Sequence, residues 1–151
     1  MIIYRNMRAE DVPAVHMLLN SNLDGRFALE VIEYFLSFWP KGQFVAVDLF
    51  GNMIGAICGA KLSNGRASVA LFAVDSAMRM QGIGSKLFQT FKTECYMEGF
   101  YEIQLEIRTT NSSAYRFYSK RGFVISEKVY DLYGPEENGY RMVAALRRAS
   151  S

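Results

Sequence analysis

The sequence has few cysteines and a weak net charge, and each shortage excludes a class of protein. Its 151 residues include only two cysteines, Cys58 and Cys95, and neither has a cysteine or histidine nearby at a metal-site spacing. We therefore expect buried, reduced thiols, no bound metal and an intracellular compartment. The formal net charge of +2 is too small for the basic field that duplex nucleic acid requires, so no nucleic-acid partner is expected.

Long apolar runs are also absent. No stretch approaches the roughly 20 apolar residues that a membrane span needs, and the N-terminus lacks a charged region followed by an apolar run. We expect a soluble, cytoplasmic protein without a membrane partner. Half of the residues are hydrophobic, and there is no repeat, low-complexity tract or linker. These features predict a single globular domain over residues 1–151.

Hydrophobic periodicity predicts an α+β (mixed α/β) fold. A strand, a helix and a strand between 69 and 108 imply a right-handed crossover, and the whole chain suggests about seven strands with helices on both faces. The expected strands lie at 2–5, 43–48, 54–62, 67–74, 103–108, 123–132 and 139–147, with a turn at 133–138. The expected helices run from Val12 to about Asn20, from Phe27 to Trp39, from Gly84 to Gly99 and from Asn111 to Gly122. The second helix is unusually apolar, which fits either core packing or a wall of a substrate groove.

The stretch LFAVDSAMRMQGIGSKL, residues 71–87, indicates an anion site. An apolar strand enters a glycine-containing turn, and a helix begins directly after it. The turn and the helix N-terminus together present unpaired backbone N–H groups, which suit a pyrophosphate. Leu87 stands where a dinucleotide fingerprint needs its third glycine, and the spacing of a phosphate-binding P-loop does not fit either. A purely structural turn at the helix start remains the alternative.

A second motif lies downstream, in EIRTTNSSAYRFYSKRGF, residues 106–123. The pairing of R-x-x-G-x-G with N-x-x-A-x-x-F-Y-x-x-x-G-F resembles the two cofactor-binding motifs of the GNAT superfamily of acyl-CoA-dependent N-acetyltransferases. The resemblance extends over most of the chain, since RNMRAEDVPAV is similar to the first strand and helix of that family. It implies a mostly antiparallel mixed sheet with a splayed central pair of parallel strands, and acetyl-CoA as the cofactor.

The resemblance also assigns residues to the cofactor. It implies that the end of the strand lies beside the acetyl group and pantetheine arm, and that the amides of 81–85 surround the pyrophosphate. Met80 stands at a position that is often basic in the family, which leaves the backbone cradle intact. The assigned residues are Phe72, Ala73, Val74, Arg79, Met80, Gln81, Gly82, Ile83, Gly84, Ser85, Asn111 and Tyr118.

Two side chains are candidates for acid and base chemistry. A phenol stays protonated at neutral pH, so Tyr118 can protonate the departing CoA thiolate, unless it is an ordinary helix-face aromatic residue. Glu106, at the end of its strand, is the candidate base, directly or through a water. The alternative is a strand-face carboxylate paired with Arg108 or Lys92. The single histidine, His16, is interpreted as a satisfied helix-face residue.

The amine-binding side rests on a narrower resemblance. The segment NLDGRFALEVIEYFLSFWPKGQFVAVD and the C-terminal VYDLYGPEENGYRM are similar to protein N-terminal acetyltransferases, of the RimI-like and N-terminal acetyltransferase A catalytic-subunit types. The loop departs from them where Asp24 and Gly25 replace a Pro-Glu pair. The residues implied to contact the substrate are Leu23, Asp24, Phe27, Tyr130, Tyr133 and Tyr140, and the three tyrosines could instead only stabilise their strands.

These features predict transfer of an acetyl group from acetyl-CoA to a protein N-terminal α-amino group, by direct attack in a ternary complex. An α-amine has a pKa near 8 and needs a weaker base than lysine, which suits a site with one carboxylate. The alternatives are a small-molecule amine or polyamine N-acetyltransferase and a non-catalytic CoA-binding module. Association with the ribosome or an auxiliary subunit is left open.

Overall fold

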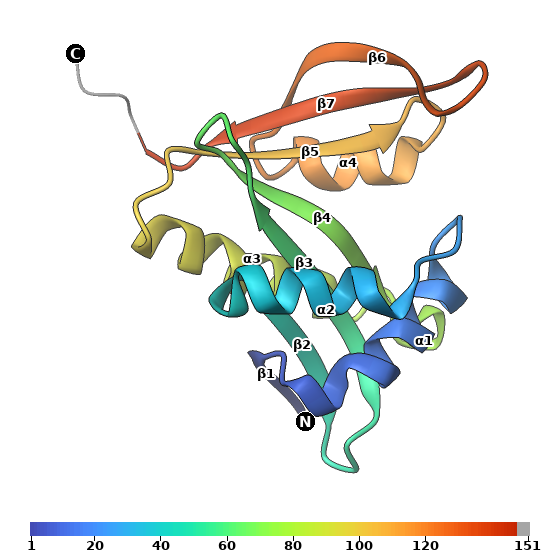
Figure 1. Ribbon diagram of the computed structural model, residues 1–151, viewed down its shortest axis with the longest axis vertical. Helices are drawn as coiled ribbons and strands as arrows, with labels where there is room; N and C mark the ends of the chain where they lie inside the picture. Colours follow the sequence, from blue (N-terminus) through green and yellow to red (C-terminus); the bar gives the residue numbers. More distant parts are fainter. Residues whose placement is uncertain (148–151) are drawn as a thin grey trace.

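Residues 1–147 are described by a computed structural model, in which seven strands form one mixed sheet in the order β1-β2-β3-β4-β5-β7-β6 (Figure 1). The strands are β1 (Ile2–Asn6), β2 (Gln43–Asp48), β3 (Met53–Lys61), β4 (Ala67–Val74), β5 (Glu102–Arg108), β6 (Val124–Gly134) and β7 (Glu137–Ala145). The α-helices in this part of the chain are α1 (Val12–Asn22), α2 (Leu29–Phe38), α3 (Ile83–Met97) and α4 (Ser112–Ser119). The predicted α+β fold, with about seven strands and about four helices, is confirmed.

Two apolar clusters hold the helices on opposite faces of the sheet. The α3 stripe of Leu87, Phe88 and Phe91 is buried against one face, where α4 also packs. On the other face, α1 and α2 bury side chains that include Leu19 and Ile32. Figure 1 shows α2 in front of the sheet and α3 behind it. The helical periodicity of the sequence therefore reflects packing on a sheet that is covered on both faces.

The sheet splits at its centre, where the neighbouring parallel strands β4 and β5 separate; we call this split the fork. Only two residue pairs, Ala67 with Ile103 and Ser68 with Gln104, join β4 to β5, and these two strands are parallel. Beyond Ser68 and Gln104 the strands diverge, as the ribbon in Figure 1 shows. The mixed sheet is thus divided into two antiparallel parts, one with β1–β4 and one with β5–β7. The splayed parallel pair implied by the family resemblance is present.

Most predicted element boundaries shift by one to three residues, and two of these shifts have a clear structural cause. The second helix begins at Leu29 rather than Phe27, because Ala28 is extended (φ −71°, ψ 149°) and stands at the helix N-cap. The turn expected at 133–138 is shorter, since β6 continues to Gly134 and β7 already begins at Glu137. The polar and glycine residues of this segment suggested a long turn, but the register pairs Gly134 with Glu137 across a tight hairpin. Within residues 1–147, no helix is long and apolar enough to cross a membrane.

Candidate active site

A cavity of about 570 Å³ lies at the open side of the fork. Its walls come from the end of β4, the following turn, the first residues of α3, helix α4 and the end of α1. The lining residues are Asn22, Leu23, Phe72, Ala73, Val74, Met78, Arg79, Met80, Gly82, Ile83, Gly84, Ser85, Asn111, Ser113, Ala114, Phe117 and Tyr118. Nearly every residue that the sequence assigned to the cofactor is therefore in one cavity, and only Gln81 is not part of the lining.

The turn before α3 forms the polar end of this cavity. Gly82 is the helix N-cap and has a left-handed backbone conformation (φ 77°), which an L side chain rarely adopts. The first intrahelical bond runs from the Lys86 N–H to the Gly82 carbonyl (3.1 Å). The N–H groups of residues 83–85 therefore have no partner within the helix and remain available to an anion. Arg79 is held close by, because its Nε donates to the Val74 carbonyl (3.2 Å).

Helix α4 forms the opposite wall of the cavity. Asn111 caps the helix through its side-chain oxygen, which accepts from the Ala114 N–H (3.0 Å), as its position in the sequence predicted. Tyr118 is only 8% exposed and packs edge-on against Phe88, Phe117 and Phe123. This burial raises the pKa of the Tyr118 phenol well above its ordinary value. Tyr118 is thus a protonated side chain on the cavity wall at any physiological pH.

A second, basic hollow of about 590 Å³ adjoins the turn. Lys86 of α3 meets Lys120 and Arg121 from the end of α4 there, with Gly82 and Ser85 at the shared edge. Arg121 is fixed in place by hydrogen bonds to the Ser85 hydroxyl and to the Phe117 carbonyl (2.7 Å), and its guanidinium lies over the Phe117 ring. The sequence analysis missed these cations, because no local pattern shows that two separate helix ends meet.

The loop between α1 and α2 closes the cavity on the other face of the sheet. Asn22 joins this loop to the end of β4, since its Oδ1 accepts from the Ser76 N–H (3.0 Å). Leu23 lines the cavity, whereas Asp24 is exposed. Phe27 is held by Asn20, which bonds both its N–H and its carbonyl, and by the ring of His16 (2.8 Å to the same carbonyl). This contact agrees with the interpretation of His16 as a satisfied helix-face residue.

The three candidate tyrosines of the β6–β7 hairpin have different surroundings. Tyr133 is half-buried beneath the Arg108 guanidinium, whose carbon lies 4.4 Å from the ring centroid. The Tyr133 ring packs closely over Gly139. A Cβ atom at residue 139 would lie 3.1 Å from a Tyr133 ring carbon and 2.6 Å from Leu132, so this packing requires a glycine. Tyr130 is 71% exposed, with only the Lys128 ammonium near its ring.

Tyr140 occupies the other face of the sheet from Glu106. It pairs with Ile107 across β5 and β7, and it packs against the same apolar cluster as Ile107. Directly opposite residues in an antiparallel pair point to the same face, so Tyr140 lies on the α3–α4 side. Burial first and the Glu106 charge second raise the pKa of the Tyr133 phenol.

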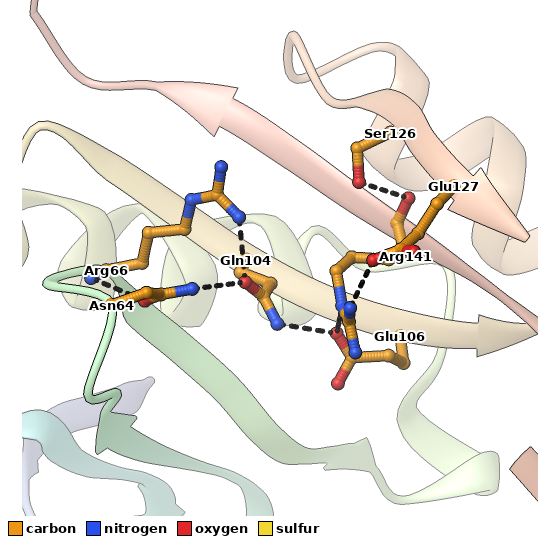
Figure 2. Close-up of polar contacts among 7 residues, drawn as sticks. All are labelled: Asn64, Arg66, Gln104, Glu106, Ser126, Glu127 and Arg141. Carbon is orange, nitrogen blue, oxygen red and sulfur yellow. Dashed lines mark hydrogen bonds and ion pairs between the residues drawn. The ribbon is translucent and has the colours of Figure 1, made fainter. Parts of the chain in front are cut away.

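Glu106 is at the base of the fork, on the face that carries α1 and α2. It follows Gln104, the last residue of β5 that pairs with β4, by two positions and shares its face. Its Oε2 accepts hydrogen bonds from Gln104 Nε2 (3.0 Å) and Arg141 Nε (3.1 Å), as Figure 2 shows. The alternative, a strand-face carboxylate in an ion pair, named Arg108 or Lys92 as its partner; Glu106 is indeed paired, but with Arg141, and Arg108 pairs with Glu137. Glu106 does not line the cavity itself.

Both cysteines lie away from this chemistry. They are buried and free, and neither lines the cavity. Burial raises the pKa of each thiol to about 12, with the Glu98 and Glu94 charges adding to the effect at Cys95. A thiol with such a pKa is a poor nucleophile at neutral pH.

The fold and the cavity define a class of protein before any comparison is made. The mixed sheet splits beside the cavity of about 570 Å³, which we also call the trough. This cavity has apolar walls and, at one end, a helix N-terminus that can bind phosphates. That arrangement suits a long thioester carrier that ends in a nucleotide. Residues 12–123 match the Acetyltransferase (GNAT) family, and the chain belongs to this family. The predicted acyl-CoA-dependent N-acetyltransferase activity and the acetyl-CoA cofactor are thereby confirmed.

Individual relatives support the same assignment. The chain is 32% identical to N-alpha-acetyltransferase 30 of Schizosaccharomyces pombe over 130 residues, which cover 83% of this chain and 86% of that protein. The crystal structure of Ard1 from Thermoplasma volcanium is 31% identical, with a TM-score of 0.91 and coverage of 97% and 99%. The crystal structure of the NatC complex bound to Gag peptide and CoA has a chain that is 26% identical, with a TM-score of 0.85 and the same coverage.

Proposed function

We propose that this enzyme acetylates the α-amino group of protein N-termini. The observation that carries the proposal is the two-sided fork, with the apolar cavity and its phenol on one side and the Glu106 carboxylate, held by Gln104 and Arg141, on the other. The similarity to N-alpha-acetyltransferase 30 and to a complex solved with a peptide and CoA supports the same substrate class. Association with the ribosome or with an auxiliary subunit stays a prediction, as does the cytoplasmic location.

The cofactor end of the site fits acetyl-CoA on the chemistry of its donors. Backbone N–H groups of residues 83–85 face the polar end of the trough, where the helix dipole favours the pyrophosphate. Lys86, Lys120 and Arg121 supply positive charge in the adjoining hollow for a further phosphate group. When it is bound, acetyl-CoA supplies an activated acyl group and a thiolate leaving group.

The two titratable groups act on opposite faces of the fork. Glu106 accepts the proton that the α-ammonium must lose before its nitrogen can attack, directly or through a water. Tyr118 donates its phenolic proton to the sulfur as the carbon–sulfur bond breaks. The high pKa of Tyr118 keeps that proton in place until the thiolate forms. The buried, high-pKa thiols of Cys58 and Cys95 support direct transfer without an acetyl-cysteine intermediate.

The amine side favours a peptide over a polyamine. A polyamine site needs several unpaired carboxylates around one groove, whereas Glu106 and Glu127 both pair with Arg141, and Glu137 pairs with Arg108. The residues assigned to the substrate include Tyr133, which lies under the Arg108 guanidinium, and Leu23, which lines the cavity. A mixed apolar and polar wall suits the first residues of a peptide chain.

The direct test is an acetylation assay with acetyl-CoA and a panel of short peptides that vary at the first two residues. The panel also contains polyamines and aminoglycosides. We expect turnover of at least one peptide and little of the small amines. In the same assay, Glu106→Gln should lower kcat by about 10² or more, because general base catalysis is worth roughly 10² to 10⁴ in rate.

Glu102→Gln is the matched control for this variant. Glu102 lies on the same strand and face but pairs with Arg66 (3.1 Å) and is connected to Glu106 only through Arg66 and Gln104, so its loss should lower kcat far less than the loss of Glu106. Turnover of polyamines without any peptide would replace the proposal with the small-amine alternative. Binding of acetyl-CoA without turnover of any amine would indicate a non-catalytic module.

A further inference from the structure

Arg141 connects the candidate base to the edge of the sheet. It lies on β7 directly opposite Glu106 of β5, and its Nε donates to Glu106 Oε2 (3.1 Å). Its Nη1 donates to Glu127 Oε1 on β6, and the Ser126 hydroxyl donates to its backbone carbonyl (3.3 Å). Figure 2 shows the guanidinium between the two carboxylates. Both hydrogen bonds raise the pKa of Arg141, so this cation is permanently charged.

Gln104 holds the same oxygen of Glu106 from the other side. Its own carbonyl oxygen accepts from Asn64 Nδ2 (3.2 Å) and Arg66 Nη1 (3.0 Å). Because two donors occupy that oxygen, the amide nitrogen of Gln104 must face Glu106, where it donates to Oε2 (3.0 Å). Gln104 is buried, so this orientation is fixed by packing as well as by hydrogen bonding.

The two oxygens of the Glu106 carboxylate therefore have different surroundings. Oε2 of Glu106 receives two hydrogen bonds, while no donor within residues 1–147 bonds Oε1. In Figure 2 the other oxygen points away from the Arg141 guanidinium. A carboxylate that is held by one oxygen cannot rotate freely, so its second oxygen is presented in one direction. Proton transfer needs such placement, since the accepting atom must lie within hydrogen-bond reach of the proton.

We propose that Arg141 is a positioning residue for catalysis, which fixes Glu106 by Oε2 and leaves Oε1 to take the proton from the substrate amine. Glu127 holds Arg141 in this role from the edge strand β6. The inference rests on the proposed function and deepens it, because it assigns the two oxygens of the base to different tasks. Arg141 touches neither the acetyl donor nor the amine and acts only through Glu106.

The test is a double-mutant cycle on the peptide reaction, with Arg141→Gln, Glu106→Gln and the two combined. We expect Arg141→Gln to lower kcat at least about tenfold, toward the roughly 10²-fold that a misplacement of about 1 Å costs, with the KM for acetyl-CoA unchanged. In the Glu106→Gln background, Arg141→Gln should have no further effect, because its only route to the reaction is gone. A residue with a purely structural role would lower the rate in both backgrounds.

Three further variants should lower kcat by less than Arg141→Gln does, or not at all. Arg141→Lys keeps the charge but not the planar fork that reaches both carboxylates, so it should restore only part of the rate. Glu127→Gln should cost less than Arg141→Gln, since the bond to Glu106 remains. Lys61→Gln removes an ion pair with Glu98 (3.2 Å) on the α3 face of the sheet, opposite to the face of Glu106, and should leave kcat unchanged.

The outcomes separate the two proposals. An active wild type with a wild-type rate for Arg141→Gln overturns the positioning role and leaves the proposed function standing. Equal losses from Arg141→Gln with and without Glu106 overturn it as well. A wild type that acetylates no peptide overturns the proposed function and, with it, this inference.

Discussion

The cofactor side and the amine side of the fork are built in different ways. The cofactor side consists of β4, the turn and α3, which are continuous in the chain, together with α4, and it uses backbone N–H groups and buried aromatic rings. The side that we propose for the amine combines a loop near residue 23, a carboxylate on β5 and side chains from β6 and β7. A site made of contiguous backbone can be recognised from local sequence, whereas a site assembled from distant side chains cannot.

The two sides of the fork also differ in their exposure to solvent and in their charge. Tyr118 is enclosed by three aromatic rings, and the groups around Glu106 are partly exposed ion pairs. Exposed ion pairs contribute little to stability by themselves, at most about 1 kcal/mol each. Their value on the amine side is therefore in orientation. The cofactor side should be sensitive to backbone shape and burial, and the amine side to the geometry of its side chains.

Removal of the phenol should give the largest effect on the cofactor side. Tyr118→Phe keeps the buried ring and removes only the proton donor, so kcat should fall by about 10², the lower end of the range for positioned acid catalysis. We place it at the lower end because burial raises the pKa of Tyr118 and makes it a weaker acid. Steady-state kinetics should show an unchanged KM for acetyl-CoA. Tyr115→Phe, on the exposed part of the same helix, is the control, and a wild-type kcat for Tyr118→Phe would remove the acid role.

The glycine turn should give an intermediate effect. Gly82→Ala introduces a side chain at a φ of 77°, which costs roughly 1–2 kcal/mol in the left-handed conformation. If the turn relaxes to avoid this cost, the amides of 83–85 lose their direction, and acetyl-CoA should bind about 5- to 30-fold more weakly in calorimetry. Gly65→Ala carries the same strain (φ 85°) in the β3–β4 turn and should leave the affinity unchanged. Equal affinities for both variants would show that the turn does not preorganise the cradle.

The smallest effect should be on stability, at the start of the helix that leads to the amine-side loop. Asp11 accepts two hydrogen bonds from Arg5 (2.7 and 3.0 Å), and this contact holds the pKa of its carboxyl below the ordinary value. Asp11→Asn should lower stability at pH 7 by about 1–2 kcal/mol, or a few degrees in Tm.

The pH dependence of this variant gives a further check. A carboxyl with a lowered folded-state pKa stabilises the protein above its unfolded-state pKa of about 3.9, and this contribution is lost as the pH falls through the folded-state value. The difference in Tm between wild type and Asp11→Asn should therefore be constant near neutral pH and shrink below about pH 4. A difference that grows toward acid would contradict the assignment. At each of these pH values, wild type and Asp11→Asn should bind acetyl-CoA with the same affinity.

Local sequence was sufficient for most of the fold and for the cofactor side. The sequence predicted the seven strands and the four α-helices of residues 1–147 but not the short 3-10 helices, because most of these elements bury one stripe in the two apolar clusters; β6, which is largely exposed, is the exception. The errors occurred where local signals were weak. Phe27 continues the apolar stripe of α2 but is held outside the helix by Asn20, and the residues after Tyr133 look like a long turn but form a tight hairpin. Both outcomes depend on specific hydrogen bonds and strand pairing, which hydrophobic periodicity does not encode.

The sequence by itself determined the acyl-CoA chemistry of this protein, because the phosphate cradle is a property of one turn and the helix that follows it. The placement of the proposed base was decided only by the tertiary structure. Glu106 was visible in the sequence, but its partner Arg141 lies 35 positions away in the chain and reaches it only because β5 pairs with β7. Hydrogen-bond register across a sheet brings such residues together, and no spacing along a single strand encodes it.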